Sequence, residues 1–217
     1  MKEAWDNDWG HSVPLICGYD RRILRSMNVT SIDFETANRS RVSICAAGIA
    51  VFEDGTLTES RYWLVRPPKG KGWFLREFTE NCHGLTRFDV QDAPEFPAIA
   101  PELLPLLTRA DIVIAHNAQF DIGVLRATLN HFGLARPEFD YICTCRVARR
   151  IWPDLPSHRL DNLAAHIGHK FHHHHAQSDA EAAGQLLLAM MKQVSANTPS
   201  ELLQKAGMGP KRSCRQN

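Results

Sequence analysis

Two strand-like segments joined by a tight turn constrain the fold of this chain more than any other feature of its sequence. Residues 41–52 and 56–65 have strand-like side-chain patterns, and Glu53-Asp54-Gly55 separates them. An Asp-Gly pair between two such runs is typical of an antiparallel hairpin. A third strand-like segment, residues 29–36, precedes the pair. The sequence therefore predicts an antiparallel meander of three strands.

Strand-like and helix-like segments alternate after this meander. Helical patterns mark residues 96–107, 117–132, 146–152 and 160–167, and short strand-like runs mark residues 111–115 and 141–143. The run from Ile112 to Ala115 is apolar throughout, which is usual for a strand that is buried on both faces. A meander followed by this alternation predicts an α/β fold, with a mixed sheet covered by helices.

Length and composition indicate one globular domain and set few limits on its function. The chain has 217 residues, and we expect an N-terminal extension over residues 1–27, a domain over residues 28–195 and a short tail over residues 196–217. The formal net charge of +1 gives no global sign of a nucleic-acid-binding protein. A site that holds a few phosphates needs only local positive charge, so this class is not excluded.

Cysteine usage and the N-terminal sequence favour a cytoplasmic protein without a membrane partner. The six cysteines show no C-x-x-C pairing, which is typical of reduced thiols rather than of a disulfide framework or a zinc site. The first residues carry acids where a secretory signal needs a basic start and an apolar run. The longest apolar run, residues 44–52, is too short to cross a bilayer as a helix.

Two acids, Asp33 and Glu35, lie two residues apart in the first strand-like segment, so both carboxylates point to the same face of a strand. Ile32 and Phe34 point to the opposite face, toward a core. Two carboxylates this close resist ionising together unless a cation compensates their charge, and Mg²⁺ and Mn²⁺ bind carboxylate oxygens. The pair is a candidate metal site, although a strand face with ordinary surface acids explains this fragment equally well.

A third acid, Asp121, follows the buried strand-like run in the first turn of the next helix, which we expect Asn117 to cap. Ligand sites in open α/β sheets favour such strand ends. An acid in the first turn also stabilises a helix through the helix macrodipole, so a purely structural role is an open alternative.

Four consecutive histidines, residues 172–175, precede the fourth acid, Asp179. Ser178 and Glu181 have the spacing of a capping box, which predicts a helix with Asp179 as its first residue and the histidines in the loop before it. From that loop, His174 can turn toward the same site as Asp179. The run could also be a tag remnant or a nonspecific metal-binding tract, but tags normally lie at a terminus.

In this order, the acidic segments resemble the three motifs of the DEDDh 3′–5′ exonuclease family. The motifs are Asp33-Phe34-Glu35, the segment from His116 to Asp121, and His174 followed five residues later by Asp179. The likeness spans about residues 28–195, which makes this region an exonuclease domain, and it includes His83-Gly84-Leu85-Thr86. The resemblance implies an RNase H-like three-layer fold with a five-stranded mixed sheet flanked by helices.

The resemblance also implies a role for each residue of the site. Two divalent cations, Mg²⁺ or Mn²⁺, would be bound by the four carboxylates of Asp33, Glu35, Asp121 and Asp179. His174 would be the general base that completes the catalytic set. The substrate would be contacted by Phe34, Thr36, His83 and Asn117. In the sister DEDDy class a Tyr takes the position of His175, so the choice of base is open between two histidines.

The substrate implied by the resemblance is single-stranded DNA or RNA with a free 3′ end, and the sequence does not choose between the two polymers. One alternative is a non-catalytic module that keeps the fold and binds nucleic acid or a polymerase, although all five catalytic positions are filled. A second alternative is an interaction domain with unrelated surface acids. It requires that the three motifs occur in this order by coincidence. A polymerase partner and a homodimer are both open.

Overall fold

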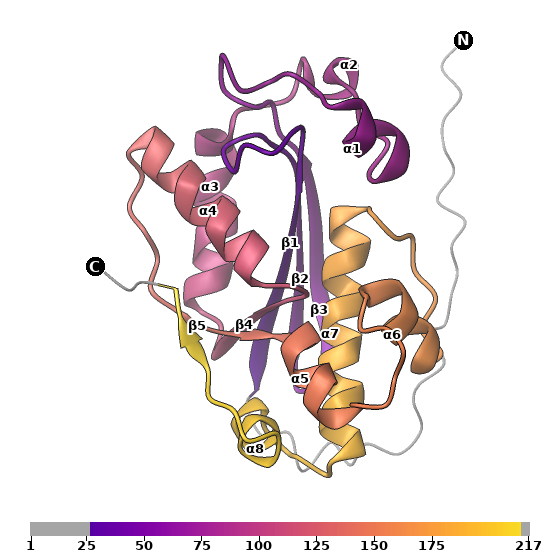
Figure 1. Cartoon of the computed structure of the whole chain (residues 1–217). Helices are drawn as coiled ribbons and strands as arrows, with labels where there is room; N and C mark the ends of the chain where they lie inside the picture. The colour runs from indigo at the N-terminus through magenta and orange to yellow at the C-terminus, as the bar shows by residue number, and fades with distance from the viewer. Residues whose placement is uncertain (1–26, 214–217) are drawn as a thin grey trace.

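The computed structural model describes residues 27–213 and contains a six-stranded mixed sheet with the order β3-β2-β1-β4-β5-β6 (Figure 1). The strands are β1 (Asn28–Thr36), β2 (Ile44–Glu53), β3 (Thr56–Leu64), β4 (Ile112–Ala115), β5 (Asp140–Cys143) and β6 (Lys211–Arg212). The helices are α1 (Arg76–Asn81), α2 (Arg87–Val90), α3 (Phe96–Thr108), α4 (Gln119–Phe132), α5 (Thr144–Ile151), α6 (Leu160–His166), α7 (Ala176–Gln193) and α8 (Pro199–Lys205).

The pairing of the strands confirms the predicted meander and the α/β class. Strand β2 pairs antiparallel with β1 and with β3, whereas β1, β4 and β5 run parallel to one another. The turn between β2 and β3 contains Asp54 with φ 49° and Gly55 with φ 76°. Two successive residues with positive φ are characteristic of the type I′ turn, whose twist matches that of the strands it joins.

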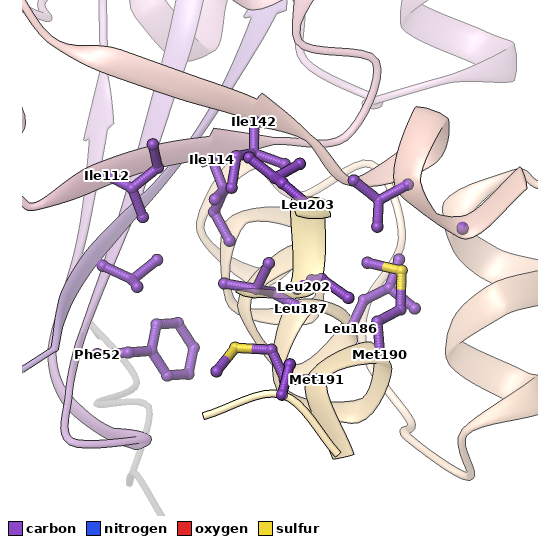
Figure 2. Packing of buried hydrophobic residues seen from close by; sticks show 14 of the residues in the cluster. Phe52, Ile112, Ile114, Ile142, Leu186, Leu187, Met190, Met191, Leu202 and Leu203 are labelled. Atoms are coloured by element: carbon purple, nitrogen blue, oxygen red, sulfur yellow. The ribbon is translucent and has the colours of Figure 1, made fainter. Parts of the chain in front are cut away.

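Helices cover both faces of the sheet, and each face has its own hydrophobic core (Figure 1). On one face α7 packs against β1 and β2, with α5, α6 and α8 around it. Figure 2 shows this core, which includes Phe52 and Ile114 of the sheet and Leu187 and Met190 of α7. On the other face, α3 and α4 pack over Ile32 and the rest of a second cluster.

The sheet has one strand more than the five that the resemblance implied. Strand β6 has only two residues and pairs antiparallel with Asp140 and Tyr141 of β5. Helix α8 precedes it and buries Leu202 and Leu203 against α7. Both elements lie in the segment expected to be a short tail. They are too short to produce a recognisable hydrophobic periodicity in the sequence. Residues 1–26 and 214–217, from the expected extension and tail, lie outside the described residues.

Helix α7 lies very close to the sheet because each of the two contacting elements has a glycine where the other approaches it. Gly48 of β2 faces the start of α7, and Gly184 of α7 faces β2. A Cβ added to Gly48 of β2 would lie 2.1 Å from the main-chain carbonyl carbon of Ala176, at the start of α7. A Cβ added to Gly184 of α7 would lie 2.0 Å from the ring of Phe52. The absence of a side chain at both positions lets the helix that carries Asp179 approach the strands.

Within residues 27–213, no helix combines the length and the apolar character that crossing a membrane requires.

Candidate active site

Strand β1 places Asp33 and Glu35 on the face that α7 covers, while Ile32 and Phe34 enter the core on the opposite face. This arrangement follows from the two-residue period of a strand. One carboxylate oxygen from each of Asp33, Glu35 and Asp179 lies within 4.8 Å of the other two. The sheet and α7 therefore bring together three of the four acids that the sequence singled out.

Asp121, the fourth acid, is buried in the first turn of α4. Its Oδ1 accepts a hydrogen bond from the main-chain N–H of Phe34 at 3.1 Å, which places it beside the acidic pair of β1. The helix begins differently from the prediction, because the N-cap residue is Ala118 and not Asn117. Asn117 instead adopts a left-handed conformation with φ 63°, and its carbonyl accepts from the N–H of Phe120.

Asp179 is buried inside the first turns of α7, which begins at Ala176 and not at Asp179. The predicted capping box does not form, because the hydroxyl of Ser178 accepts a hydrogen bond from the N–H of His172 at 3.0 Å. Asp179 also accepts a hydrogen bond from the histidine loop, from the N–H of His174 to its Oδ2 at 3.1 Å. The side chains of the first turns thus hold the histidine loop against the helix.

Burial, together with the charges of neighbouring acids, raises the pKa of all four carboxyl groups. Desolvation raises the pKa of Glu35 to about 8, and the charges of Asp179 and Asp121 add to the rise. Burial also raises the pKa of Asp121 to about 8, against the opposing hydrogen bond from Phe34. The pKa values of Asp33 and Asp179 are raised for the same main reason. Such a cluster of hard oxygen donors fits a divalent cation, because the cation stabilises the charged form of every member.

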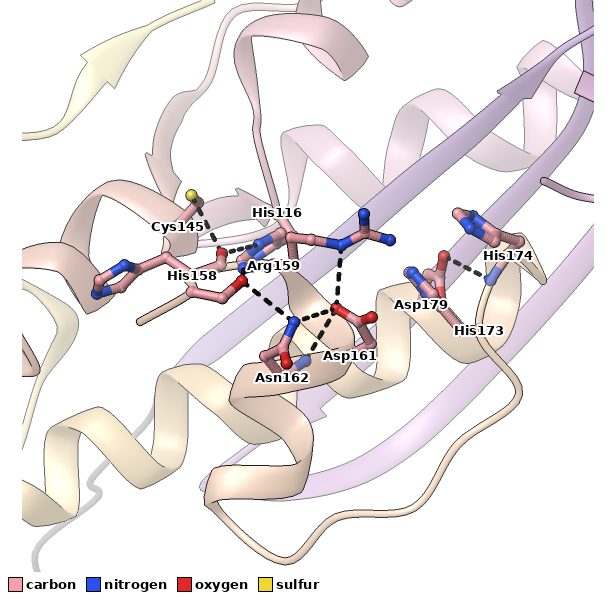
Figure 3. Close-up of polar contacts among 10 residues, drawn as sticks. His116, Cys145, His158, Arg159, Asp161, Asn162, His173, His174 and Asp179 are labelled. Atoms are coloured by element: carbon pink, nitrogen blue, oxygen red, sulfur yellow. Dashed lines mark hydrogen bonds and ion pairs between the residues drawn. The ribbon is translucent and has the colours of Figure 1, made fainter. Parts of the chain in front are cut away.

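The side chains of the histidine loop point in two directions. The ring of His174 stacks on that of His173 at 3.8 Å, and Nδ1 of His173 contacts Oδ1 of Asp179 at 3.3 Å (Figure 3). The ring of His175 instead stacks on Tyr62 of β3 at 4.4 Å. Of the two histidines left open by the sequence, His174 is therefore the one grouped with Asp179.

The four residues expected to contact substrate differ in exposure. The side chains of Phe34 and Thr36 are buried, whereas Asn117 is exposed. His83 is half-buried, its Nε2 lies 3.2 Å from the carbonyl oxygen of Thr36, and its Nδ1 accepts from the N–H of Leu85. Because the ring of Phe34 belongs to the core, any contact that it makes with substrate is limited to its main chain or to the ring edge.

Two features near the site were not predicted from the sequence. His173 contacts Asp179, and only the loop conformation distinguishes it from its three identical neighbours. His116 is largely buried and contacts both Thr144 and the carbonyl of His158 at 3.0 Å (Figure 3). The second contact joins residues 42 positions apart, which no local sequence pattern reveals.

Proteins similar in sequence to this chain include polymerases and exonucleases. The model of the exonuclease family (RNase T type) matches residues 31–187. The PolC-type DNA polymerase III of Streptococcus pneumoniae (strain ATCC BAA-255 / R6) is 32% identical over 187 residues, which cover 84% of this chain and 12% of the relative. The 3′-5′ exonuclease DinG of Bacillus subtilis (strain 168) is 28% identical over 167 residues, 75% of this chain and 17% of the relative. The chain thus spans less than a fifth of the length of these relatives.

Solved structures with the same fold are also exonucleases. Exonuclease X in complex with 5′ overhanging duplex DNA has a TM-score of 0.65 and 24% identity, over 82% of this chain and 99% of that chain. The nuclease domain of 3′hExo, a DEDDh family member bound to rAMP, has a TM-score of 0.64 and 16% identity, over 80% of this chain and 96% of that chain. These likenesses confirm the RNase H-like fold. The chain therefore belongs to the exonuclease family that the matching model describes, whose members use divalent metal ions.

Proposed function

We propose that this protein is a metal-dependent 3′–5′ exonuclease that removes nucleotides from single-stranded DNA or RNA with a free 3′ end. The observation that carries the proposal is the convergence of four acids, from β1, α4 and α7, beside the loop that holds His174. Residues 28–195 are proposed as the exonuclease domain. The family membership of the chain supports the same activity.

The four carboxylates would hold two divalent cations, Mg²⁺ or Mn²⁺. Asp33 would bind both ions, Glu35 and Asp179 the one next to the attacking water, and Asp121 the other. Bound there, such ions would supply electrostatic stabilisation to the attacking and leaving oxygens at phosphorus. The purely oxygen donor set supports Mg²⁺ or Mn²⁺ over softer metals.

His174 is the proposed general base, which takes the proton of the attacking water. Burial lowers the pKa of its imidazole, so the ring is neutral near pH 7 and able to accept that proton. Its main-chain hydrogen bond to Asp179 holds the residue next to the acids. The stacking of His175 on Tyr62 favours His174 over His175 for this role.

The substrate strand would contact the end of β1 through the groups around Phe34, Thr36, His83 and Asn117. The relatives and solved structures include proteins named for DNA and for RNA, so both polymers are candidates. Because several relatives are PolC-type polymerases, a polymerase is a candidate partner, as is a second copy of the chain. The described cysteines are free thiols, in agreement with the proposed cytoplasmic location.

The proposal is tested with 5′-labelled single-stranded DNA and RNA of identical sequence, each with a free or a phosphorylated 3′ end. With Mg²⁺ or Mn²⁺ we expect a ladder that shortens from free 3′ ends, and no ladder in EDTA or with Asp33→Ala. Internal cuts, or no metal-dependent cleavage of either polymer, would overturn the proposal. Binding of the strands without cleavage would instead support the non-catalytic module on the same fold.

A further inference from the structure

We propose that Arg159 binds a backbone phosphate of the substrate strand, the one next to the scissile phosphate on its 5′ side, and that His116 holds the loop that positions this arginine. The inference rests on the proposed function and extends it to a residue outside the three acidic motifs. It is built on a network of contacts between the start of α5 and the start of α6 (Figure 3).

The carbonyl group just before Arg159 is held from two sides. Nε2 of His116 lies 3.0 Å from the carbonyl oxygen of His158, and Sγ of Cys145 donates to the same oxygen at 3.4 Å. The side chain of His158 in turn contacts the carbonyl of Trp152 at 2.9 Å. The main chain that leads into Arg159 is thereby fixed to α5 and to the end of β4.

His116 is suited to this anchoring because burial lowers the pKa of its imidazole to about 4 and leaves the ring neutral. A neutral ring has one N–H and one acceptor nitrogen. Because the His158 carbonyl can only accept, the N–H is on Nε2, and Nδ1 is the acceptor nitrogen. Nδ1 lies 3.0 Å from the hydroxyl of Thr144, whose single proton has the carbonyl of Ala115 as a second acceptor at 3.3 Å. Both ring nitrogens thus have a polar partner, and the contact through Nε2 defines the position of the loop.

The side chain of Arg159 has its phosphate-binding atoms free. It is 68% exposed, and its Nε contacts Oδ1 of Asp161 at 3.4 Å. Within residues 27–213, no hydrogen bond or ion pair engages its two terminal nitrogens. An exposed ion pair of this kind contributes little to stability but orients the side chain. The guanidinium group is left with a planar pair of donors, which matches a phosphate.

Arg159 points toward the acidic site. Figure 3 shows its side chain extending from the His116 network toward Asp179 and His174. Burial is the main cause of the lowered pKa of His174 and of the raised pKa of the Cys82 thiol, at the C-cap of α1. The charge of Arg159 acts on both groups and favours a lower pKa in each. The guanidinium group is thus near both the histidine loop and α1, at the rim of the site. Because the scissile phosphate must lie at the carboxylates, a cation at the rim fits the neighbouring phosphate of the strand.

The test compares wild type with Arg159→Gln on two substrates, a single-stranded oligonucleotide and the p-nitrophenyl ester of thymidine 5′-monophosphate, which has only one phosphate. For the oligonucleotide we expect KM to rise about tenfold with kcat within about twofold. The slope of log KM against log salt should fall by about 0.7, the value for one phosphate contact on a single strand. Turnover of the ester should not change.

Arg212→Gln is the matched control, because Arg212 is 72% exposed and contacts Asp140 through Nε at 3.2 Å, but lies on β6. It should leave KM and the salt slope as in wild type. His116→Phe should reproduce the rise in KM with kcat retained, and the double variant with Arg159→Gln should be no worse than Arg159→Gln alone. A purely structural role for His116 would instead lower kcat on both substrates and add to the effect of Arg159→Gln.

An unchanged KM and salt slope in Arg159→Gln, or an equal loss of kcat on both substrates, would overturn the inference and leave the exonuclease proposal intact. If wild type itself degrades neither substrate, the proposed function fails. In that case, the binding of a labelled single strand in the presence of Ca²⁺, measured by fluorescence anisotropy, still tests whether Arg159 contacts a phosphate. Weaker binding by Arg159→Gln than by wild type supports the phosphate contact, and equal binding overturns it.

Discussion

The main-chain N–H of Phe34 donates a hydrogen bond to Oδ1 of Asp121 at 3.1 Å, which joins the strand of the first acidic motif directly to the helix of the second. Phe34 thus has two functions in the fold. Its ring belongs to the core under α3 and α4, and its main-chain N–H positions the carboxylate of Asp121. The position of Asp121 relative to Asp33 and Glu35 is therefore set by the protein itself.

Replacement of Asp33 should remove catalysis. We expect Asp33→Ala to lower kcat more than about a hundredfold and to abolish the rise in melting temperature that Mn²⁺ produces, because this residue is proposed to bind both ions. Melting in EDTA should be no lower than for wild type, since a repelling carboxyl group is removed. Activity within about tenfold of wild type would contradict a two-metal site at these acids.

The histidines of the loop should differ in their effects. His174→Ala is expected to lower kcat by about 10²–10⁴ with Mn²⁺ binding retained, which is the usual contribution of a general base. His175→Ala should keep most of the activity, because its ring packs on Tyr62. Steady-state kinetics of the two variants measure the loss of a general base, and their metal-dependent melting measures the loss of a metal ligand. The two measurements together distinguish these roles. The reverse order of effects would assign the base to His175.

The stability of the metal-free protein should fall as the pH rises. The folded pKa values of Glu35 and Asp121, about 8, lie above the ordinary values of these carboxyl groups, 4.5 and 3.8. The folded state therefore holds more protons than the unfolded state between about pH 4 and pH 8, and its stability is lost progressively across that window.

Thermal melting in EDTA and in Mg²⁺ between pH 6 and pH 8.5 measures this effect. The melting temperature in EDTA should fall with pH, and the increase produced by Mg²⁺ should grow, because ion binding displaces fewer protons at high pH. Glu35→Gln removes one of the titrating groups, so its melting temperature in EDTA should depend less on pH. A metal-free melting temperature that rises with pH would contradict the raised pKa values.

Gly48→Ala should damage both stability and activity. The added Cβ would overlap the main chain of Ala176, and we expect a loss of about 2 kcal/mol or more in the free energy of unfolding. Because α7 must move away from the sheet, Asp179 moves away from Asp33 and Glu35, and kcat should fall. Chemical denaturation and steady-state kinetics measure the two effects. Gly209→Ala, where the Cβ meets nothing within 4 Å, is the control and should change neither quantity.

The parts of the fold that the sequence predicted are those fixed by local periodicity. The two-residue period of β1 correctly placed Asp33 and Glu35 opposite Ile32 and Phe34, and the Asp-Gly pair correctly located the β2–β3 turn. These signals need only neighbouring residues, because the geometry of a strand or a tight turn is local.

The features that the sequence did not reveal depend on contacts between distant or competing groups. The Ser178 hydroxyl was expected to cap a helix and instead accepts from the N–H of His172, since α7 starts three residues earlier than predicted, at Ala176. The pairing of β6 with β5 joins residues about seventy positions apart through two residues only. The direction of each histidine in the loop is decided by partners such as Tyr62 and Asp179.

The central place of β1 in the sheet has a consequence for the durability of the site. Strand β1 has hydrogen-bonded neighbours on both sides, β2 and β4, and α7 covers its acidic face. Interior strands of this kind exchange their amide protons only through large-scale opening, whereas loops and edges fray readily. Asp33 and Glu35 directly follow the stretch Val29–Ser31, where β1 is paired on both sides, and they themselves pair with β2. Their geometry should therefore be lost only when the paired centre of the sheet opens, whereas the histidine loop can open on its own.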